Sequence, residues 1–149
     1  DAIILARAGV ERLKLQKHIS SIISTDEILP AVGQGALGIE IHEDNKFAFD
    51  VVQTIHDENT FAAIAAERTL LKALEGGCQV PIGAFAQVKS NGFYLTGMVG
   101  ALDGSVTFRK TVRGKKADAV KLGKALAKDL LKAGAKEILD EIYKTVRLK

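Results

Sequence analysis

The hydrophobic positions in the middle of the chain recur with the period of an α-helix. This pattern predicts one helix over residues 45–56 and a second over residues 58–75, separated by Asp57. Gly76 and Gly77 follow the second segment, and glycine is common just after the end of a helix. We therefore expect two consecutive helices, the second ending at this glycine pair.

From residue 81 the period changes to two, so that apolar and polar residues alternate as in a half-buried strand. Three such runs predict strands at residues 81–90, 93–101 and 105–113. The connections between them hold dipeptides that favour tight hairpin turns, namely Asn91-Gly92 and Asp103-Gly104. The pattern indicates an antiparallel meander.

Two more helices are predicted at about residues 117–133 and 135–146, with Gly134 as the break between them. One face of the first is apolar and carries Ala119, Leu122, Leu126 and Leu130. Together with the preceding helix and the meander, these segments predict a C-terminal α+β unit with a three-stranded antiparallel sheet over residues 56–149.

The first 55 residues follow a different pattern. The apolar run at residues 1–6 is typical of a buried strand in an α/β sheet, and we expect its partner strands to lie outside this chain. A helix is predicted from Gly9 to about residue 24, and Pro30 predicts extended chain leading to a strand from Gly35. These segments are expected to be parts of a larger α/β body.

Composition narrows the class of protein. A content of 47% hydrophobic and 26% charged residues is typical of soluble globular proteins. Lysine and arginine exceed aspartate and glutamate by only 21 to 18, which is too mild for a nucleic-acid-binding face. The single cysteine cannot form an intramolecular disulfide, and no apolar run approaches the about 18 residues of a membrane span. We expect a cytoplasmic protein without membrane or nucleic-acid partners.

The segment Gly33–Gly38 matches the G-x-G-x-x-G pattern of dinucleotide-binding proteins, but its context differs. That pattern requires a strand before it and a helix after it, whereas here the glycines follow Pro30 and lead into a strand-like run. The sequence instead favours a close-packed turn that places Gln34 near a ligand.

Several charged or titratable residues can be explained by structural roles, without a metal ion or a ligand. The three histidines lie apart without metal-ligand spacing, so we expect surface side chains and no metal site at His18, His42 and His56. Four lysines recur at helical spacing, namely Lys121, Lys124, Lys128 and Lys132. This lysine stripe favours a solvated outer face of a helix over an anion-binding surface. On a helical wheel, Glu67 falls on the apolar face and Arg68 at its edge, which favours an ion pair with a neighbouring domain over direct ligand contact.

The stretch EGGCQVPIG holds the one cysteine, Cys78, between a glycine pair and Pro81. Glycines leave space beside the sulfur and permit unusual backbone angles, so the thiol is a plausible point of covalent attachment. A cysteine protease needs a nearby base, and no histidine lies close in the sequence. An inert packed cysteine remains the alternative.

Four stretches together resemble hydroxymethylbilane synthase, also called porphobilinogen deaminase, across essentially the entire chain: DAIILARAGVERL, LPAVGQGALGIE, AAERTLLKALEGGCQVPIGA and GALDGS. The resemblance implies the C-terminal half of a three-domain enzyme whose α/β domains are similar to periplasmic binding proteins. It assigns residues 1–29 to the end of the middle domain, residues 30–55 to a segment returning to the first domain, and residues 56–149 to the cofactor-attachment domain.

The resemblance also implies a site. Cys78 would form a thioether to a dipyrromethane cofactor, which primes the head-to-tail condensation of four porphobilinogen molecules into hydroxymethylbilane with loss of ammonia. Arg12 would contact the carboxylates of the growing polypyrrole, where the planar guanidinium suits bidentate binding. The backbone turn from Ala6 to Gly9 would lie near the cofactor, as would Gln34 and Gly35. The role of Arg7 stays open.

The resemblance further implies that Glu67 and Arg68 bridge domains. It also implies that the catalytic aspartate belongs to a missing N-terminal half, so that the chain alone is expected to be inactive. Two alternatives from other classes stay open: a nucleic-acid-binding α+β module, and a non-catalytic interaction domain in which Cys78 is part of the core.

Overall fold

The centre of the structure is the predicted antiparallel meander. The computed structural model describes residues 1–75 and 80–147. Strands β1 (Ile82–Lys89), β2 (Gly92–Gly100) and β3 (Thr107–Gly114) pair in the order β1-β2-β3, and both pairings are antiparallel. Gly92 and Gly104 adopt positive φ angles of 142° and 73° at the two connections. The predicted meander is confirmed.

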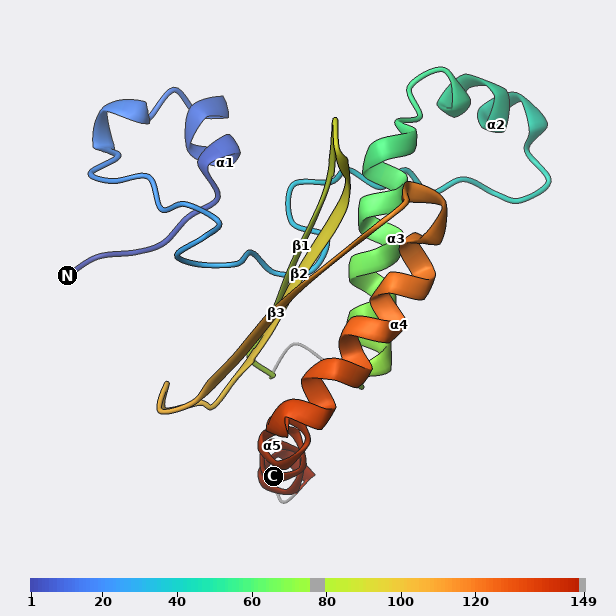
Figure 1. The fold of residues 1–149 in the computed structure, drawn as a ribbon. Helices are drawn as coiled ribbons and strands as arrows, with labels where there is room; N and C mark the ends of the chain where they lie inside the picture. Colours follow the sequence, from blue (N-terminus) through green and yellow to red (C-terminus); the bar gives the residue numbers. More distant parts are fainter. Residues whose placement is uncertain (76–79, 148–149) are drawn as a thin grey trace.

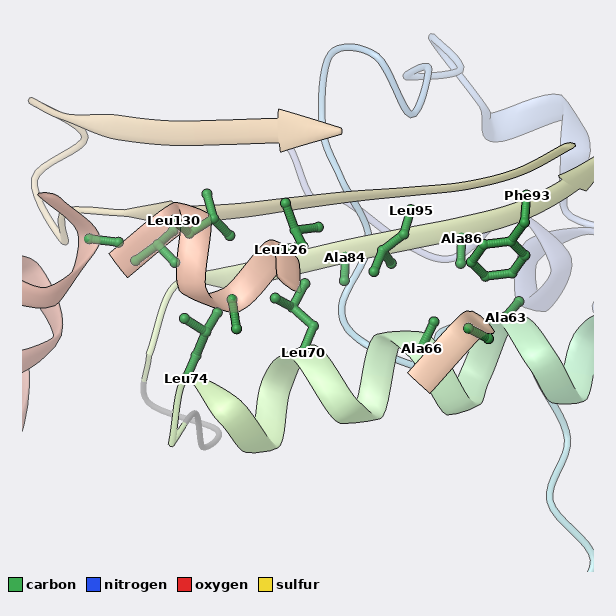
Figure 2. Close-up of a cluster of buried hydrophobic side chains, with 14 of the residues drawn as sticks. Ala63, Ala66, Leu70, Leu74, Ala84, Ala86, Phe93, Leu95, Leu126 and Leu130 are labelled. Atoms are coloured by element: carbon green, nitrogen blue, oxygen red, sulfur yellow. The ribbon is translucent and has the colours of Figure 1, made fainter. Parts of the chain in front are cut away.

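Two helices cover one face of this sheet, α3 (Glu58–Ala73) and α4 (Ala119–Leu130) (Figure 1). The side chain of Asp57 caps α3 by accepting a hydrogen bond from the backbone N–H of Thr60 at 2.6 Å. Between the helices and the sheet lies the hydrophobic core (Figure 2). Its largest fully buried side chains are Phe93, Leu70, Leu74, Leu95, Leu126, Leu130 and Val99.

The two helices approach closely because small residues face each other. A Cβ atom added at Gly123 of α4 would lie 2.6 Å from the carbonyl oxygen of Ala66 and 2.9 Å from the Cβ of Thr69, both on α3. No side chain fits at this point. The glycine therefore sets the distance between the helix axes.

The chain continues beyond α4 through a short π-helical turn, η3 (Leu131–Ala135), into α5 (Lys136–Arg147). Gly134 has a φ of 116°, which separates the two helices as the sequence predicted. A 3₁₀ turn, η2 (Lys116–Asp118), precedes α4. The C-terminal α+β unit is thus as expected, with helix boundaries within a few residues of the predicted ones.

The N-terminal part forms less regular structure than predicted. It contains α1 (Arg7–Arg12), the 3₁₀ turn η1 (Gln16–His18) and the predicted helix α2 (Lys46–Gln53). The predicted helix from Gly9 to about residue 24 is wrong in its length, because the helix ends at Arg12 and Lys14 adopts a φ of 58°.

The two strands predicted in this part do not form among the described residues, and the expectation that residues 1–6 pair with strands outside this chain stays a prediction. Residues 1–6 and the segment from Gly35 pair with no strand among the described residues. A strand needs a neighbour for its backbone hydrogen bonds, and an apolar run cannot supply one by itself. Large apolar side chains consequently stay exposed in this part, including Ile3, Ile4, Leu5, Leu13, Leu37, Ile39, Phe47 and Ile55.

One N-terminal segment nevertheless packs on the sheet, on the side opposite α3 and α4 (Figure 1). The guanidinium of Arg109 on β3 donates to the carbonyl oxygens of Asp26 at 2.6 Å and Thr25 at 2.8 Å. Leu29 is buried, and the carbonyl oxygen of Pro30 accepts a hydrogen bond from the N–H of Ala84 on β1 at 3.1 Å. No helix in the described part of the chain is long and apolar enough to cross a membrane.

Candidate functional site

The loop formed by residues 31–36 is a tight turn, as the glycine pattern predicted. Gly33 and Gly35 have φ angles of 78° and 86°, and beyond the glycine and its two chain neighbours no atom lies within 4 Å of the position that a Cβ would take at either residue. The backbone N–H of Gln34 donates to the carbonyl oxygen of Ala31 at 3.0 Å. Gln34 itself is exposed, so the turn offers an amide side chain and glycine backbone to a ligand.

This turn is attached to the C-terminal unit by Glu67 of α3. One carboxylate oxygen, Oε2, accepts a hydrogen bond from the N–H of Gly33, and the other, Oε1, accepts one from the N–H of Ala86 on β1, both at 2.8 Å. The Glu67 residue is only 4% exposed. The carboxylate therefore links three segments at one buried point.

Burial raises the pKa of Glu67 above its ordinary value, and the hydrogen bonds from Gly33 and Ala86 oppose this shift. Among the residues that the structure describes, the carboxylate of Glu67 forms no ion pair and its partners are backbone amides, so the ion pair with a neighbouring domain stays a prediction. Two N–H groups can satisfy both oxygens of a buried carboxylate without a cation.

Arg68, the neighbour of Glu67, is exposed and has no hydrogen bond or ion pair to the described part of the chain. The structure leaves its guanidinium accessible to a group outside residues 1–75 and 80–147.

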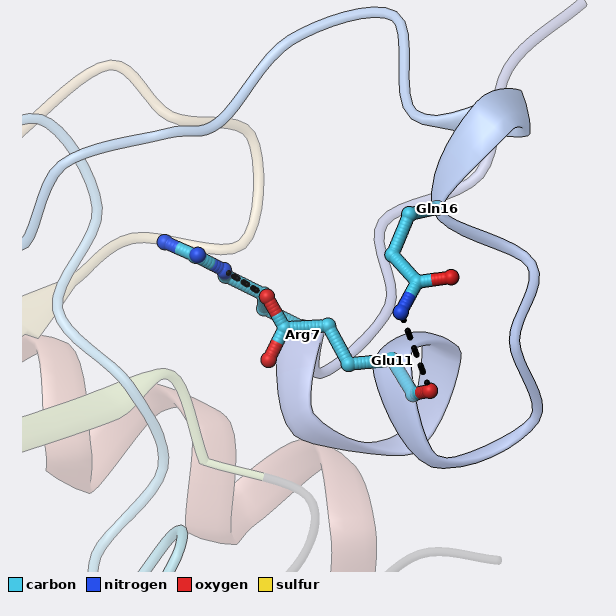
Figure 3. A network of polar contacts seen from close by, with 3 residues as sticks. All are labelled: Arg7, Glu11 and Gln16. Carbon is cyan, nitrogen blue, oxygen red and sulfur yellow. Dashed lines mark hydrogen bonds and ion pairs between the residues drawn. The ribbon is translucent and has the colours of Figure 1, made fainter.

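The arginines of α1 differ in their surroundings. The Nε of Arg7 donates to Oε1 of Glu11 at 2.5 Å, and the side chain of Gln16 donates to the carbonyl oxygen of Glu11 at 3.2 Å (Figure 3). Arg12 is exposed and pairs with no carboxylate among the described residues. Of the two arginines, Arg12 is therefore the one available to an anionic ligand.

The backbone turn before α1 is equally open. The N–H of Gly9 donates to the carbonyl oxygen of Ala6 at 3.0 Å, and no atom outside the local backbone and the neighbouring residues lies within 4 Å of the position of a Cβ at Gly9. No hydrogen bond or ion pair in the described chain joins this turn or Arg12 to Gln34 or Gly35. The structure joins the 31–36 turn to α3 and β1, and it leaves the α1 residues as a separate group.

Comparisons with known protein families match both the α1 residues and the 31–36 turn. A family model described as "Porphobilinogen deaminase, dipyromethane cofactor binding domain" matches residues 1–50, and one described as "Porphobilinogen deaminase, C-terminal domain" matches residues 61–132. The chain belongs to the porphobilinogen deaminase family.

Individual family members show the same similarity. The porphobilinogen deaminase of Syntrophobacter fumaroxidans is 44% identical over 144 residues, which are 97% of this chain and 47% of the relative. That of Maridesulfovibrio salexigens is 48% identical over 143 residues, or 96% of this chain and 46% of the relative. The chain thus spans about half the length of the relatives that it matches.

Cys78, the family's expected attachment residue, lies outside the described residues. The structure does define both flanks of its segment, the end of α3 and the start of β1. The hydroxyl of Tyr143 on α5 donates to the carbonyl oxygens of Leu74 at 3.2 Å and Glu75 at 2.5 Å. The C-terminal helix therefore stabilises the end of α3 directly before the cysteine segment.

The described residues fit the dipyrromethane group that the family model names. A dipyrromethane made from porphobilinogen carries carboxylates, and Arg12 offers an unpaired guanidinium for them. The turns at Gly9 and Gly35 present open backbone next to which a planar pyrrole can lie.

The three histidines lie at the surface, as predicted, since all of them are exposed. No cluster of potential metal ligands occurs in residues 1–75 and 80–147. The lysine stripe of α4 faces solvent, since each of its members is exposed. Ala86 is the site residue that sequence reasoning missed, because its contribution is a backbone N–H and no side-chain pattern signals one.

Proposed function

We propose that this chain is the C-terminal part of a hydroxymethylbilane synthase, which condenses four porphobilinogen molecules head to tail with loss of ammonia and releases hydroxymethylbilane. The observation that carries the proposal is the pair of family matches, which cover the cofactor-binding and C-terminal domains of porphobilinogen deaminase in chain order. The proposed class is a transferase of tetrapyrrole and haem biosynthesis.

In this proposal Cys78 holds the dipyrromethane cofactor through a thioether. The cofactor, when bound, supplies the primer to which porphobilinogen units are added. Arg12 binds carboxylates of the cofactor or of the growing polypyrrole through its exposed guanidinium. Gln34 and Gly35 lie along one side of the bound group, and the turn from Ala6 to Gly9 contributes backbone on another.

We propose that the chain contributes to three domains of the enzyme. We assign residues 1–29 and 30–55 to two α/β domains similar to periplasmic binding proteins, and residues 56–149 to the attachment domain. The two family matches end and begin on either side of the boundary at residue 55. The exposed apolar residues of the first two segments are suited to packing against an N-terminal half in the same enzyme.

That N-terminal half would also bring the catalytic aspartate, so we expect no synthase activity from the 149-residue chain alone. Arg68, exposed beside the buried Glu67, is suited to a contact between domains. We place the enzyme in the cytoplasm, with porphobilinogen and the linear polypyrrole as its ligands and without nucleic acid or membrane.

The test uses a reconstituted enzyme, defined as this chain joined to the part of the Syntrophobacter fumaroxidans relative that precedes the matched region. Intact mass is expected to show one dipyrromethane on Cys78, and supplied porphobilinogen is expected to yield hydroxymethylbilane. Cys78→Ser is expected to lack both. An unmodified thiol together with no product would overturn the proposal and favour a non-catalytic interaction domain.

A further inference from the structure

Residues 24–30 form a strap across the face of the sheet that lies opposite α3 and α4 (Figure 1). The strand register places Arg109 of β3 beside Met98 of β2, and Met98 beside Gly83 of β1. These residues form one row that runs from one edge strand of the sheet to the other. The strap follows this row and is attached at both of its ends.

At the β1 end, the strap is held by packing and by a backbone hydrogen bond. Leu29 is buried, and a Cβ atom added at Gly83 would lie 2.9 Å from the Cβ of Leu29. The carbonyl oxygen of Pro30 accepts a hydrogen bond from the N–H of Ala84 at 3.1 Å. The 31–36 turn follows this attachment directly, so its entry has a fixed place on β1.

At the β3 end, the strap forms a closed turn that meets Arg109. The N–H of Ser24 donates to a carboxylate oxygen of Glu27 at 2.9 Å, and the N–H of Glu27 donates to the hydroxyl of Ser24 at 3.3 Å. Such reciprocal hydrogen bonds are those of a capping box. The turn offers the carbonyl oxygens of Thr25 and Asp26 to Arg109, at 2.8 Å and 2.6 Å.

Arginine suits position 109 because two acceptors have to be held together. The guanidinium carries its N–H donors in a rigid plane, so that Nη1 and Nη2 reach different carbonyl oxygens at the same time. A lysine ammonium keeps the charge but lacks this planar fork. Among the described residues, no other side chain outside the strap donates a hydrogen bond to it. The β3 end of the strap therefore depends on Arg109.

The strap connects the two groups of candidate ligand residues. Arg12 precedes it at the end of α1, and Gln34 follows it in the 31–36 turn. Residues 20–23, between α1 and the strap, form no hydrogen bond within the part of the chain that the structure describes. Arg109 is thus the point at which the chain leaves the sheet toward α1.

We propose that Arg109 is a positioning residue that fixes the place of Arg12 relative to Gln34 by holding the strap on β3. The inference rests on the proposed function, in which both residues contact the same polypyrrole. Groups that bind one ligand together must keep a constant separation. Release of the β3 end would lengthen the free connection to α1 and widen the range of positions that Arg12 can take.

The first test measures the separation of the two groups in the chain carrying Cys78→Ser, so that spin labels attach only at introduced cysteines. The labels are placed beside α1 by Lys17→Cys and beside the 31–36 turn by Leu37→Cys. Arg109→Gln is expected to widen the distribution of label-to-label distances about twofold. Lys110→Gln, at the exposed next residue of β3, is the matched control. Equal widths for the two variants would overturn the proposal.

The second test is a double-mutant cycle in the reconstituted enzyme. Arg109→Gln is expected to raise the KM for porphobilinogen about threefold, and to leave it unchanged when Arg12→Gln is already present, since Arg109 acts through Arg12. Arg109→Lys is expected to give an intermediate KM, because one of two hydrogen bonds can be kept.

An equal rise in KM with and without Arg12→Gln would show that Arg109 acts through stability alone, and it would overturn this role while the proposed function stands. If the unsubstituted reconstituted enzyme makes no hydroxymethylbilane, the proposed function fails, and the role of Arg109 in binding fails with it.

Discussion

Glu67 accepts a hydrogen bond from the backbone N–H of Gly33, 34 residues earlier in the chain, at 2.8 Å. Its second oxygen is occupied by Ala86, so the buried carboxylate has both acceptors in use. A single side chain of α3 thereby connects the family's glycine turn to the hydrophobic core of the C-terminal domain. We expect substitutions that remove both of these acceptors to destabilise the chain more than a substitution that removes one.

Glu67→Ala is expected to lower the free energy of unfolding by about 2 kcal/mol, because two buried N–H groups lose their acceptor. Glu67→Gln is expected to lower it by less, since one acceptor remains. Urea denaturation of the chain followed by circular dichroism measures both values. Equal stability of Glu67→Ala and the unsubstituted chain would contradict the structural role of these hydrogen bonds.

The contribution of Glu67 also depends on pH. Because its folded-state pKa is raised by burial, its contribution to stability is fully present below its ordinary pKa of 4.5 and is lost as the pH rises through the folded-state pKa. We expect the stability of the unsubstituted chain, relative to Glu67→Gln, to decrease as pH rises from 4.5.

At lower pH we expect stability to change with pH in the opposite direction, so that it falls as the pH falls. Local hydrogen bonds lower the pKa values of Glu27, Asp57 and Asp103, so their contributions are present above their ordinary pKa values and are lost as the pH falls through the folded-state ones. The two windows are separate, and urea titrations at a series of pH values distinguish them. A difference between the unsubstituted chain and Glu67→Gln that rises with pH above 4.5 would contradict the first expectation.

The contact of α3 with α4 gives a third prediction. Gly123→Ala is expected to lower the free energy of unfolding by about 1–3 kcal/mol, because the new methyl group meets the backbone of Ala66 and the helices must separate. Gly38→Ala is the matched control, with no atom within 4 Å of the new methyl group. Similar thermal denaturation midpoints for the two variants would show that the helices can move apart freely.

Arg109 supports the N-terminal segment on the sheet. Arg109→Gln removes the donors to the carbonyl oxygens of Thr25 and Asp26, so we expect faster proteolysis within residues 19–29 with little change in global stability. Limited proteolysis followed by mass spectrometry locates the cleavage sites. Lys110→Gln, at the exposed neighbouring position, is expected to behave like the unsubstituted chain.

A substitution of Arg12 tests whether this residue binds carboxylates in the reconstituted enzyme. Arg12→Gln is expected to raise the KM for porphobilinogen about tenfold, the effect of losing about 1.4 kcal/mol from a charge-assisted hydrogen bond. Lys17→Gln removes an exposed positive charge nearby in the sequence and serves as the control. An equal KM for both variants would exclude a specific contact at Arg12.

The elements whose signals are local could be predicted from the amino-acid sequence. The helix α3, the three strands and their glycine turns follow from the spacing of apolar residues and from dipeptides with restricted backbone angles. The sequence also contained the motifs that identify the family. These signals are local because each depends on residues only a few positions apart.

The contacts between distant segments follow from three-dimensional packing and could not be predicted from local patterns. The wheel placed Glu67 on an apolar face, but its partners are backbone groups of Gly33 and Ala86, which no side-chain pattern can indicate. Likewise, residues 1–6 have the composition of a strand, yet they form none here because a ladder requires a second segment beside them. Hydrogen-bond partners and strand neighbours are properties of three-dimensional packing, and the folded chain alone assigns them.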